Sequence, residues 1–290
     1  MSYYKLLGLE QEPFSATPDP DFLFLSREYD LALTNILIEL RLRRGLSVIL
    51  GDVGTGKTTL SRKLVKELKE RNDFLFHVIL NPTFESEKEF LLSLVKNFDV
   101  PLTRDINDTT VSDLRDMFEK FLLHTTLENN MTVVLIIDEA QKLSYETLES
   151  LRLLLNYETN EFKLLQLVLL GQLEFYSTIM QIPNFYDRID FKFTLNPLGL
   201  EETRDLINFR LRKAGYKGSG SLFLEEVIED IYHATKGYPR GIVRLCHLCL
   251  RALAVSRRKV VVDRELVSQA LEKDAGFKWH KITIPQRKNY

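Results

Sequence analysis

The sequence predicts an α/β fold: a mostly parallel, five-stranded sheet flanked by helices, followed by a small all-helical domain. Two observations lead to this prediction. Short apolar segments alternate with amphipathic helical patterns over the first two thirds of the chain, which is typical of a parallel sheet. Near residue 200 the strand-like segments stop, and only helical patterns follow.

The predicted strands are short runs rich in Val, Ile and Leu, at 46–50, 74–80, 132–137, 164–170 and 190–195. A leading helix is predicted at 27–43, and further core helices at 57–70, 86–98, 111–129, 144–157 and 173–180. The polar stretch 99–110 is expected to be a loop, and a break around Pro197 and Gly199 ends the core. Beyond it, helices are predicted at 201–213, 222–235, 240–256 and 263–273.

The segment after the first predicted strand fits the phosphate-loop pattern G-x-x-x-x-G-K-[ST] and reads Gly51-Asp52-Val53-Gly54-Thr55-Gly56-Lys57-Thr58. The strand before it and the helix after it give the pattern its physical meaning, because N–H groups at a helix N-terminus attract anions. Lys57 is expected to reach the β- and γ-phosphates of ATP and Thr58 to hold Mg²⁺, with Thr59 beside them. The alternative is a chance match in a glycine-containing turn.

The third predicted strand ends in two carboxylates, Asp138 and Glu139. In open α/β sheets ligands bind outside the carboxyl ends of the strands, so both acids are expected to face the crevice. Asp138 suits the Mg²⁺ shell, through water, and Glu139 suits a general base that orients the attacking water. The alternative is a pair of solvated turn residues. With the phosphate loop, the acids predict an ATPase, because phosphoryl transfer needs positioning and charge neutralisation.

Four regions are expected along the chain. An N-terminal segment, 1–45, packs near the nucleotide site; the nucleotide-binding core spans 46–197; a helical lid domain spans 198–275; and a basic tail covers 276–290. The tail carries four Lys or Arg residues between Phe277 and Tyr290 and no acid.

Composition narrows the functional classes. A formal net charge of -2 argues against a global field that draws the chain to nucleic acid or an anionic membrane. We find neither an apolar run of the roughly 20 residues that a membrane helix needs nor a signal peptide. With only 2 cysteines, a cytoplasmic location is expected. Cys246 and Cys249 have C-x-x-C spacing, but buried structural thiols are favoured over a zinc or redox site.

The phosphate loop, the Asp-Glu strand end and the C-terminal helices together resemble an AAA+ ATPase, a P-loop NTPase with a helical lid. Further segments narrow the resemblance to the ExeA-like family (general secretion pathway protein A). They cover nearly the whole chain and include Phe14–Ser26, Arg44-Gly45, Ile137–Ser144, Leu170-Gly171-Gln172 and Gly237-Tyr238-Pro239-Arg240.

The resemblance implies further roles. Gln172 matches sensor 1, which contacts the γ-phosphate or the attacking water, and Arg240 matches sensor 2, which reads the γ-phosphate from the lid. Arg188 matches an arginine that reaches a neighbouring subunit's nucleotide as a finger. The alternatives are a surface turn amide, a helix-start arginine paired on the surface and an ordinary surface arginine. The resemblance also places the stretch from Tyr29 to Asn35 near the adenine.

Secretion-associated members carry a transmembrane segment and a peptidoglycan-binding domain after the ATPase, and this sequence up to Tyr290 has neither, so a stand-alone form is expected. The first hypothesis is an ATPase that forms a homo-oligomeric ring or filament with ATP and acts on a protein partner. The second is an ATP-dependent, DNA-binding regulator of a DDE transposase, of the TniB, MuB or TnsC type. The third is a nucleotide switch or scaffold linked to secretion or envelope assembly. Duplex DNA is suggested by basic residues on one predicted helix and its end: Arg240, Arg244, Arg251, Arg257, Arg258 and Lys259.

Overall fold

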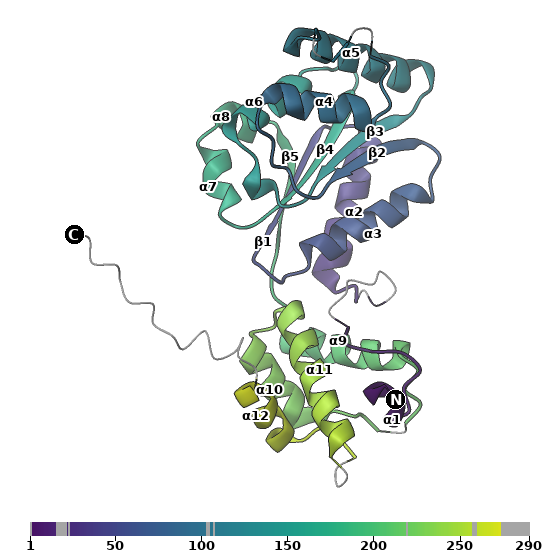
Figure 1. The fold of residues 1–290 in the computed structure, drawn as a ribbon, viewed down its shortest axis with the longest axis vertical. Coiled ribbons are helices and arrows are strands. Elements are labelled where there is room, and N and C mark those ends of the chain that lie inside the picture. The colour runs from purple at the N-terminus through teal and green to yellow at the C-terminus, as the bar shows by residue number, and fades with distance from the viewer. Residues whose placement is uncertain are drawn as a thin grey trace, which may run out of the picture. The chain divides into compact units, whose positions relative to one another are not determined.

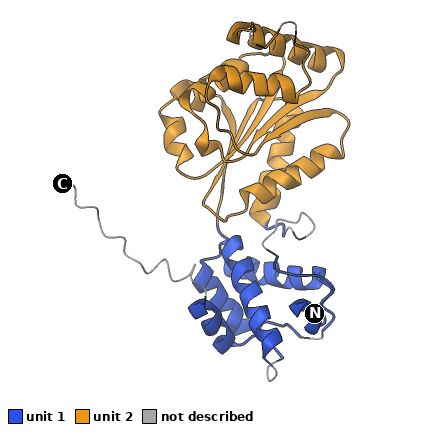
Figure 2. Cartoon of the chain, viewed as in Figure 1, with its two compact units in different colours: residues 1–26, 197–290 blue, residues 27–196 orange. Residues whose placement is uncertain are grey.

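The chain forms two compact units, coloured separately in Figure 2. We call residues 27–196 the sheet unit, and residues 1–26 with 197–290 the helical unit. A computed structural model describes residues 2–15, 22, 24–102, 105–106, 108–218, 220–256 and 260–273. The predicted N-terminal segment, 1–45, is divided between the units, because helix α2 (Arg27–Leu42) packs against the sheet.

The sheet is entirely parallel, with the strand order β2-β3-β4-β1-β5 (Figure 1). All the predicted strands are confirmed, each within one residue at either end: β1 (Leu46–Gly51), β2 (Phe74–Ile79), β3 (Thr132–Ile137), β4 (Leu165–Gly171) and β5 (Ile189–Leu195). Every residue of β3 and β4 is buried, which explains their continuous apolar sequences. Since the strands are parallel, their carboxyl ends meet at one edge of the sheet.

Helices cover both faces of the sheet, with α2 and α3 on one face and α4 to α8 on the other (Figure 1). Their bounds are α3 (Lys57–Lys69), α4 (Glu87–Asn97), α5 (Val111–Leu123), α6 (Tyr145–Leu154), α7 (Phe175–Met180) and α8 (Pro183–Tyr186). The helix predicted at 111–129 is α-helical only to Leu123, because a π-helical turn, η2 (His124–Glu128), follows. The sequence pattern did not predict the single turn α8.

The helical unit has its own hydrophobic core. Its helices are α1 (Tyr3–Leu6), α9 (Leu200–Lys213), α10 (Glu225–Thr235), α11 (Pro239–Val255) and α12 (Arg264–Lys273). Phe14 and Phe22 of the N-terminal segment belong to this core, and Phe14 packs edge-on against Phe223. The first residues of the chain therefore complete a unit that is built mainly from its end.

The two cysteines lie in α11 and are both fully buried, as expected of structural thiols. Burial raises the pKa of Cys246 and raises that of Cys249 to about 12, so both thiols stay protonated and unreactive at neutral pH.

Some predictions concern residues outside the described ranges: Arg257, Arg258 and Lys259, the tail 276–290, and residues 16–21 and 23 of the Phe14–Ser26 segment. Within the described ranges, we find no helix with the length and apolar character needed to cross a bilayer.

Candidate functional site

The phosphate loop joins the end of β1 to the first residue of α3. Gly54 (φ 88°) and Gly56 (φ 100°) adopt left-handed conformations that favour glycine. The Thr55 hydroxyl donates to the Asp52 carbonyl at 2.9 Å, and the Asp52 carboxylate accepts the Val53 N–H at 2.7 Å. The loop thus turns tightly into α3, whose first amides have no partner within the helix.

Tyr29 of α2 packs against the phosphate loop and holds it by a hydrogen bond. Its hydroxyl donates to the Thr55 carbonyl at 2.8 Å, and the side chain is buried. A Cβ atom placed on Gly56 would lie 1.7 Å from the Tyr29 hydroxyl oxygen, so any side chain there would collide with the tyrosine. Burial raises the pKa of Tyr29, which keeps the hydroxyl a donor.

Lys57 brings the loop together with the acids at the end of β3. Its ammonium is buried and donates to the carbonyls of Gly51 at 2.8 Å and Asp52 at 3.0 Å. Burial lowers the pKa of Lys57, whereas the negative charges of Glu139, Asp138 and Asp52 oppose that shift. The lysine therefore lies within the electrostatic reach of the predicted general base, Glu139, and of the predicted Mg²⁺ ligand, Asp138.

Asp138 and Glu139 follow β3 directly, but their surroundings differ. Asp138 is only 2% exposed; its carboxylate accepts the Glu139 N–H at 2.9 Å, and its own N–H donates to the Ile79 carbonyl at 2.9 Å. Glu139 adopts a left-handed conformation (φ 57°) and its side chain is 34% exposed. Asp138 is thus buried and fixed in place, whereas the Glu139 side chain is partly exposed.

Gln172, the sensor 1 candidate, follows β4 at the same edge of the sheet. Its backbone N–H donates to the side-chain oxygen of Gln141 at 3.0 Å, and the Gln141 amide nitrogen donates to the Glu139 carboxylate at 2.8 Å. Gln141 belongs to the segment Ile137–Ser144, which carries part of the family resemblance, but no function was predicted for Gln141 from the sequence.

Arg188 lies at the opposite end of the sheet. The β1–β5 register pairs Leu46 with Ile189 and Gly51 with Leu195, so Arg188 is separated from the phosphate loop by the length of β1. At about 3.3 Å per residue this length is roughly 20 Å. Arg188 does not join the phosphate loop of its own chain.

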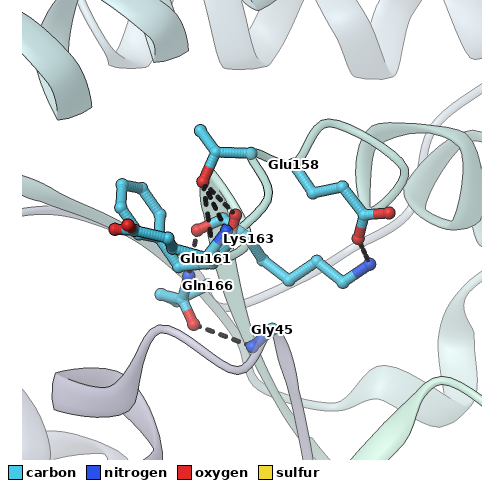
Figure 3. Close-up of polar contacts among 7 residues, drawn as sticks. Gly45, Glu158, Glu161, Lys163 and Gln166 are labelled. Atoms are coloured by element: carbon cyan, nitrogen blue, oxygen red, sulfur yellow. Dashed lines mark hydrogen bonds and ion pairs between the residues drawn. The ribbon is translucent and has the colours of Figure 1, made fainter.

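The surroundings of Arg188 include a short polar turn, drawn in Figure 3, between α6 and β4. Lys163 pairs with the Glu158 carboxylate there, while buried Gln166 accepts the Gly45 N–H at 2.9 Å. The Lys163 hydrogen bond and charge lower the pKa of Glu158, and the more distant charge of Arg188 adds to that effect.

Arg240 belongs to the helical unit, where it is exposed on the first turn of α11 after Pro239. The sheet unit thus gathers Gly51 to Thr59, Asp138, Glu139 and Gln172 at one edge. Arg188 lies at the opposite end of the same sheet, and Arg240 belongs to the helical unit. The individual catalytic roles of all these residues stay predictions.

The gathered residues fit a magnesium nucleotide chemically. Loop amides, the helix N-terminus and the Lys57 ammonium are donors suited to phosphate oxygens. The Thr58 hydroxyl and the Asp138 carboxylate are oxygen ligands of the type that Mg²⁺ prefers, directly or through water. Glycine at position 56 leaves room for the Tyr29 hydroxyl that holds the loop in this shape.

Comparisons with known proteins agree with this arrangement. The AAA domain family matches residues 40–179. Over 262 residues the chain is 34% identical to general secretion pathway protein A of Aeromonas hydrophila, a match that covers 89% of the chain. The chain is an ExeA-like AAA+ protein. It covers 46% of that relative, about half of its length.

Solved structures place this ExeA-like protein in the same fold as several AAA+ proteins. It aligns with the ORC2 protein of Aeropyrum pernix at a TM-score of 0.67 and 19% identity, over 94% of this chain and 74% of the other. The ORC1 protein of Aeropyrum pernix, in complex with DNA, aligns at 0.63 and 17%, over 90% and 69%. The RuvB branch migration motor of Thermotoga maritima aligns at 0.56 and 17%, over 86% and 70%.

Proposed function

We propose that this protein binds ATP with Mg²⁺, hydrolyses it, and acts on a partner through ATP-dependent oligomerisation. The observation that carries the proposal is the position of Lys57, which is bonded to the phosphate-loop carbonyls and lies within the field of Asp138 and Glu139. A buried cation beside two carboxylates and a helix N-terminus suits a site that binds phosphate groups and neutralises their negative charge.

The proposed mechanism divides the work among these residues. The loop amides and Lys57 hold the β- and γ-phosphates, and Thr58 and Asp138 hold the cation. When bound by these residues, Mg²⁺ would supply positive charge that offsets the negative charge of the phosphate oxygens. Glu139 orients the attacking water and takes its proton, since its carboxylate is partly exposed at the end of β3 and can be reached by water. Gln172 contacts the γ-phosphate or the water.

Arg188 supports an assembled form. Because it lies about one strand length from its own phosphate loop, any catalytic role must be played at a neighbouring subunit's nucleotide. An arginine supplied in this way makes hydrolysis depend on assembly, in a ring or filament. The rate per subunit should then rise with protein concentration, whereas a flat rate would contradict assembly-dependent hydrolysis.

The direct test combines turnover with binding of a fluorescent ATP analogue. Lys57→Ala should abolish nucleotide binding, because it removes the charge at the phosphates. Glu139→Gln should keep binding but abolish turnover, because it preserves shape without a base. Lys69→Ala, an exposed lysine at the end of the same helix, is the matched control and should behave like the wild type. Unchanged binding in Lys57→Ala would overturn the proposal.

A second candidate is an ATP-dependent, DNA-binding regulator of a transposase. It is favoured by Arg240, Arg244 and Arg251, which are exposed on α11 at spacings that fall near one helical face. The net charge of -2 counts against it. Phosphate contacts would make the logarithm of the affinity for duplex DNA fall steeply with the logarithm of the salt concentration. Binding to duplex DNA that does not depend on salt, or no binding to DNA in the presence of ATP, would exclude this candidate.

A third candidate is a nucleotide switch or scaffold linked to secretion, favoured by the similarity to general secretion pathway protein A. In such a protein the nucleotide mainly orders the lid and turnover is dispensable. Appreciable hydrolysis that is lost in Glu139→Gln while ATP still binds would exclude it.

A further inference from the structure

Gln141 connects the proposed general base to the end of a different strand. Its amide nitrogen donates to the Glu139 carboxylate at 2.8 Å, and its amide oxygen accepts the backbone N–H of Gln172 at 3.0 Å. Glu139 follows β3 and Gln172 follows β4, so this one side chain bridges neighbouring strands at the nucleotide edge of the sheet.

The two partners fix the orientation of the Gln141 amide. Glu139 offers only acceptor oxygens when ionised, and the backbone N–H of Gln172 can only donate. Exchanging the amide oxygen and nitrogen would set carbonyl against carboxylate and N–H against N–H. Only one orientation satisfies both partners, so the side chain transmits a directional constraint.

Glu139 needs such a constraint. It is 34% exposed, and its side chain leaves a backbone in the left-handed region, at the start of the short turn η3 (Ala140–Lys142). A half-exposed glutamate keeps several rotamers, and confining it to one costs conformational entropy. A general base must lie within hydrogen-bond reach of the water it activates, so its rotamer matters for catalysis.

Besides Lys57, the cation Lys142 lies near Glu139, but it is poorly suited to holding the Glu139 side chain in one rotamer. Its ammonium lies 3.9 Å from the carboxylate and donates to the Asn81 side-chain oxygen at 3.2 Å. It is also 47% exposed, and exposed ion pairs hold geometry weakly. The short bond from Gln141 is therefore the stronger constraint on Glu139.

We propose that Gln141 is a positioning residue that holds the Glu139 carboxylate in its working orientation and couples it to the end of β4. The inference rests on the proposed ATPase function and deepens it. Because Gln172 is the sensor 1 candidate, a γ-phosphate that engages the end of β4 would be linked to the general base through Gln141. Hydrolysis would then depend on correct seating of the nucleotide at both strands.

Two substitutions separate the halves of this bridge. Gln141→Leu has similar size but removes both hydrogen bonds. Gln141→Glu keeps an acceptor for the Gln172 N–H but places a carboxylate against Glu139. Lys142→Met is the matched control, since it removes the ammonium 3.9 Å from the Glu139 carboxylate and leaves both Gln141 hydrogen bonds intact.

The experiment measures kcat and KM for ATP, the affinity for a fluorescent ATP analogue, and hydrogen exchange at the Gln172 amide in nucleotide-free protein. Gln141→Leu should lower kcat about tenfold or more, because losing a hydrogen bond to a charged group costs enough free energy to slow a reaction by more than about tenfold. The KM for ATP and the affinity for the analogue should stay within about twofold of the wild-type values. The Gln172 amide of this variant should exchange faster. Gln141→Glu should lower kcat similarly while the Gln172 amide stays protected, and Lys142→Met should keep kcat within about threefold.

The results distinguish the inference from the function on which it rests. A wild-type protein without Mg²⁺-dependent hydrolysis would overturn both. An active wild type with unchanged kcat in Gln141→Leu would overturn the inference alone, as would equal losses of kcat and affinity, which indicate general damage to the site. An unaltered Gln172 amide in Gln141→Leu would overturn the coupling to β4.

Discussion

The contact between Tyr29 and Gly56 predicts that the phosphate loop tolerates no side chain at its last glycine unless the tyrosine also changes. We consider Gly56→Ala, Tyr29→Phe and the double variant. A Cβ atom at position 56 would lie 1.7 Å from the tyrosine hydroxyl oxygen and 2.9 Å from the ring carbon that bears it. Removing the hydroxyl therefore relieves most of the collision but leaves the unfavourable backbone conformation.

The magnitudes follow from these contacts. Alanine at φ 100° costs about 1–2 kcal/mol, since left-handed backbone disfavours L side chains. The collision adds about 1–3 kcal/mol, because Tyr29 is buried and cannot move aside cheaply. Tyr29→Phe alone leaves the Thr55 carbonyl without its 2.8 Å donor and costs about 1–3 kcal/mol. The double variant should therefore lose about 1–2 kcal/mol less than the sum of the single variants.

Urea unfolding of the four proteins measures these free energies, and binding of a fluorescent ATP analogue reports on the loop. Gly56→Ala should abolish detectable binding, and the double variant should regain part of the stability. Tyr145→Phe, which alters an exposed tyrosine of the same unit, is the control and should change stability by less than about 0.5 kcal/mol. Losses that add within about 0.5 kcal/mol would refute the argument, because residues in contact should not behave independently.

Three further predictions concern other parts of the chain. Gly237→Ala should destabilise the helical unit by about 3 kcal/mol or more, measured by thermal unfolding, because a Cβ atom would lie 2.0 Å from the Leu198 carbonyl oxygen at φ 74°. Gln166→Leu should cost about 1–3 kcal/mol in urea unfolding, because it leaves the Gly45 N–H unpaired in a buried site. Arg188→Ala should spare nucleotide affinity but lower turnover by about two orders of magnitude or more, measured at a concentration where the protein assembles.

Each of these predictions has a control or a contradicting result. Gly8→Ala shares the left-handed backbone, φ 75°, but meets no atom within 4 Å, so it should cost only about 1 kcal/mol. Gln181→Leu, at an exposed position, should be nearly neutral and controls for Gln166→Leu. Wild-type turnover in Arg188→Ala would make that arginine an ordinary surface residue.

The strands were predictable because burial on both faces of a parallel sheet leaves a local trace in the sequence. β3 and β4 are wholly buried and read as unbroken apolar runs. The one-turn helices α1 and α8 were not predicted, because four residues are too few to display a helical period. The change to π-helix at His124 also has no compositional signal.

The residues of the candidate site also differ in whether the sequence alone could locate them. The phosphate loop and the pair Asp138 and Glu139 are local patterns next to a strand, so the sequence locates them. Tyr29 and Gln141 depend on partners 26 and 31 residues away, Thr55 and Gln172, and only the fold brings them together. The family resemblance placed the stretch from Tyr29 to Asn35 near the nucleotide, but no local pattern marks Tyr29 or Gln141 as having such a partner.

The split of residues 1–45 between the two units has a consequence for how the protein is made. Phe14 and Phe22 precede the sheet unit in the chain, yet their core partners in the helical unit, such as Phe223, are translated only after the whole sheet unit. Contacts so distant in sequence form late, and apolar segments that wait for them are prone to aggregate. The segment that precedes the sheet unit therefore lacks these core partners until the sheet unit has been translated. A fragment that begins at residue 27 would leave the helical unit with an incomplete core.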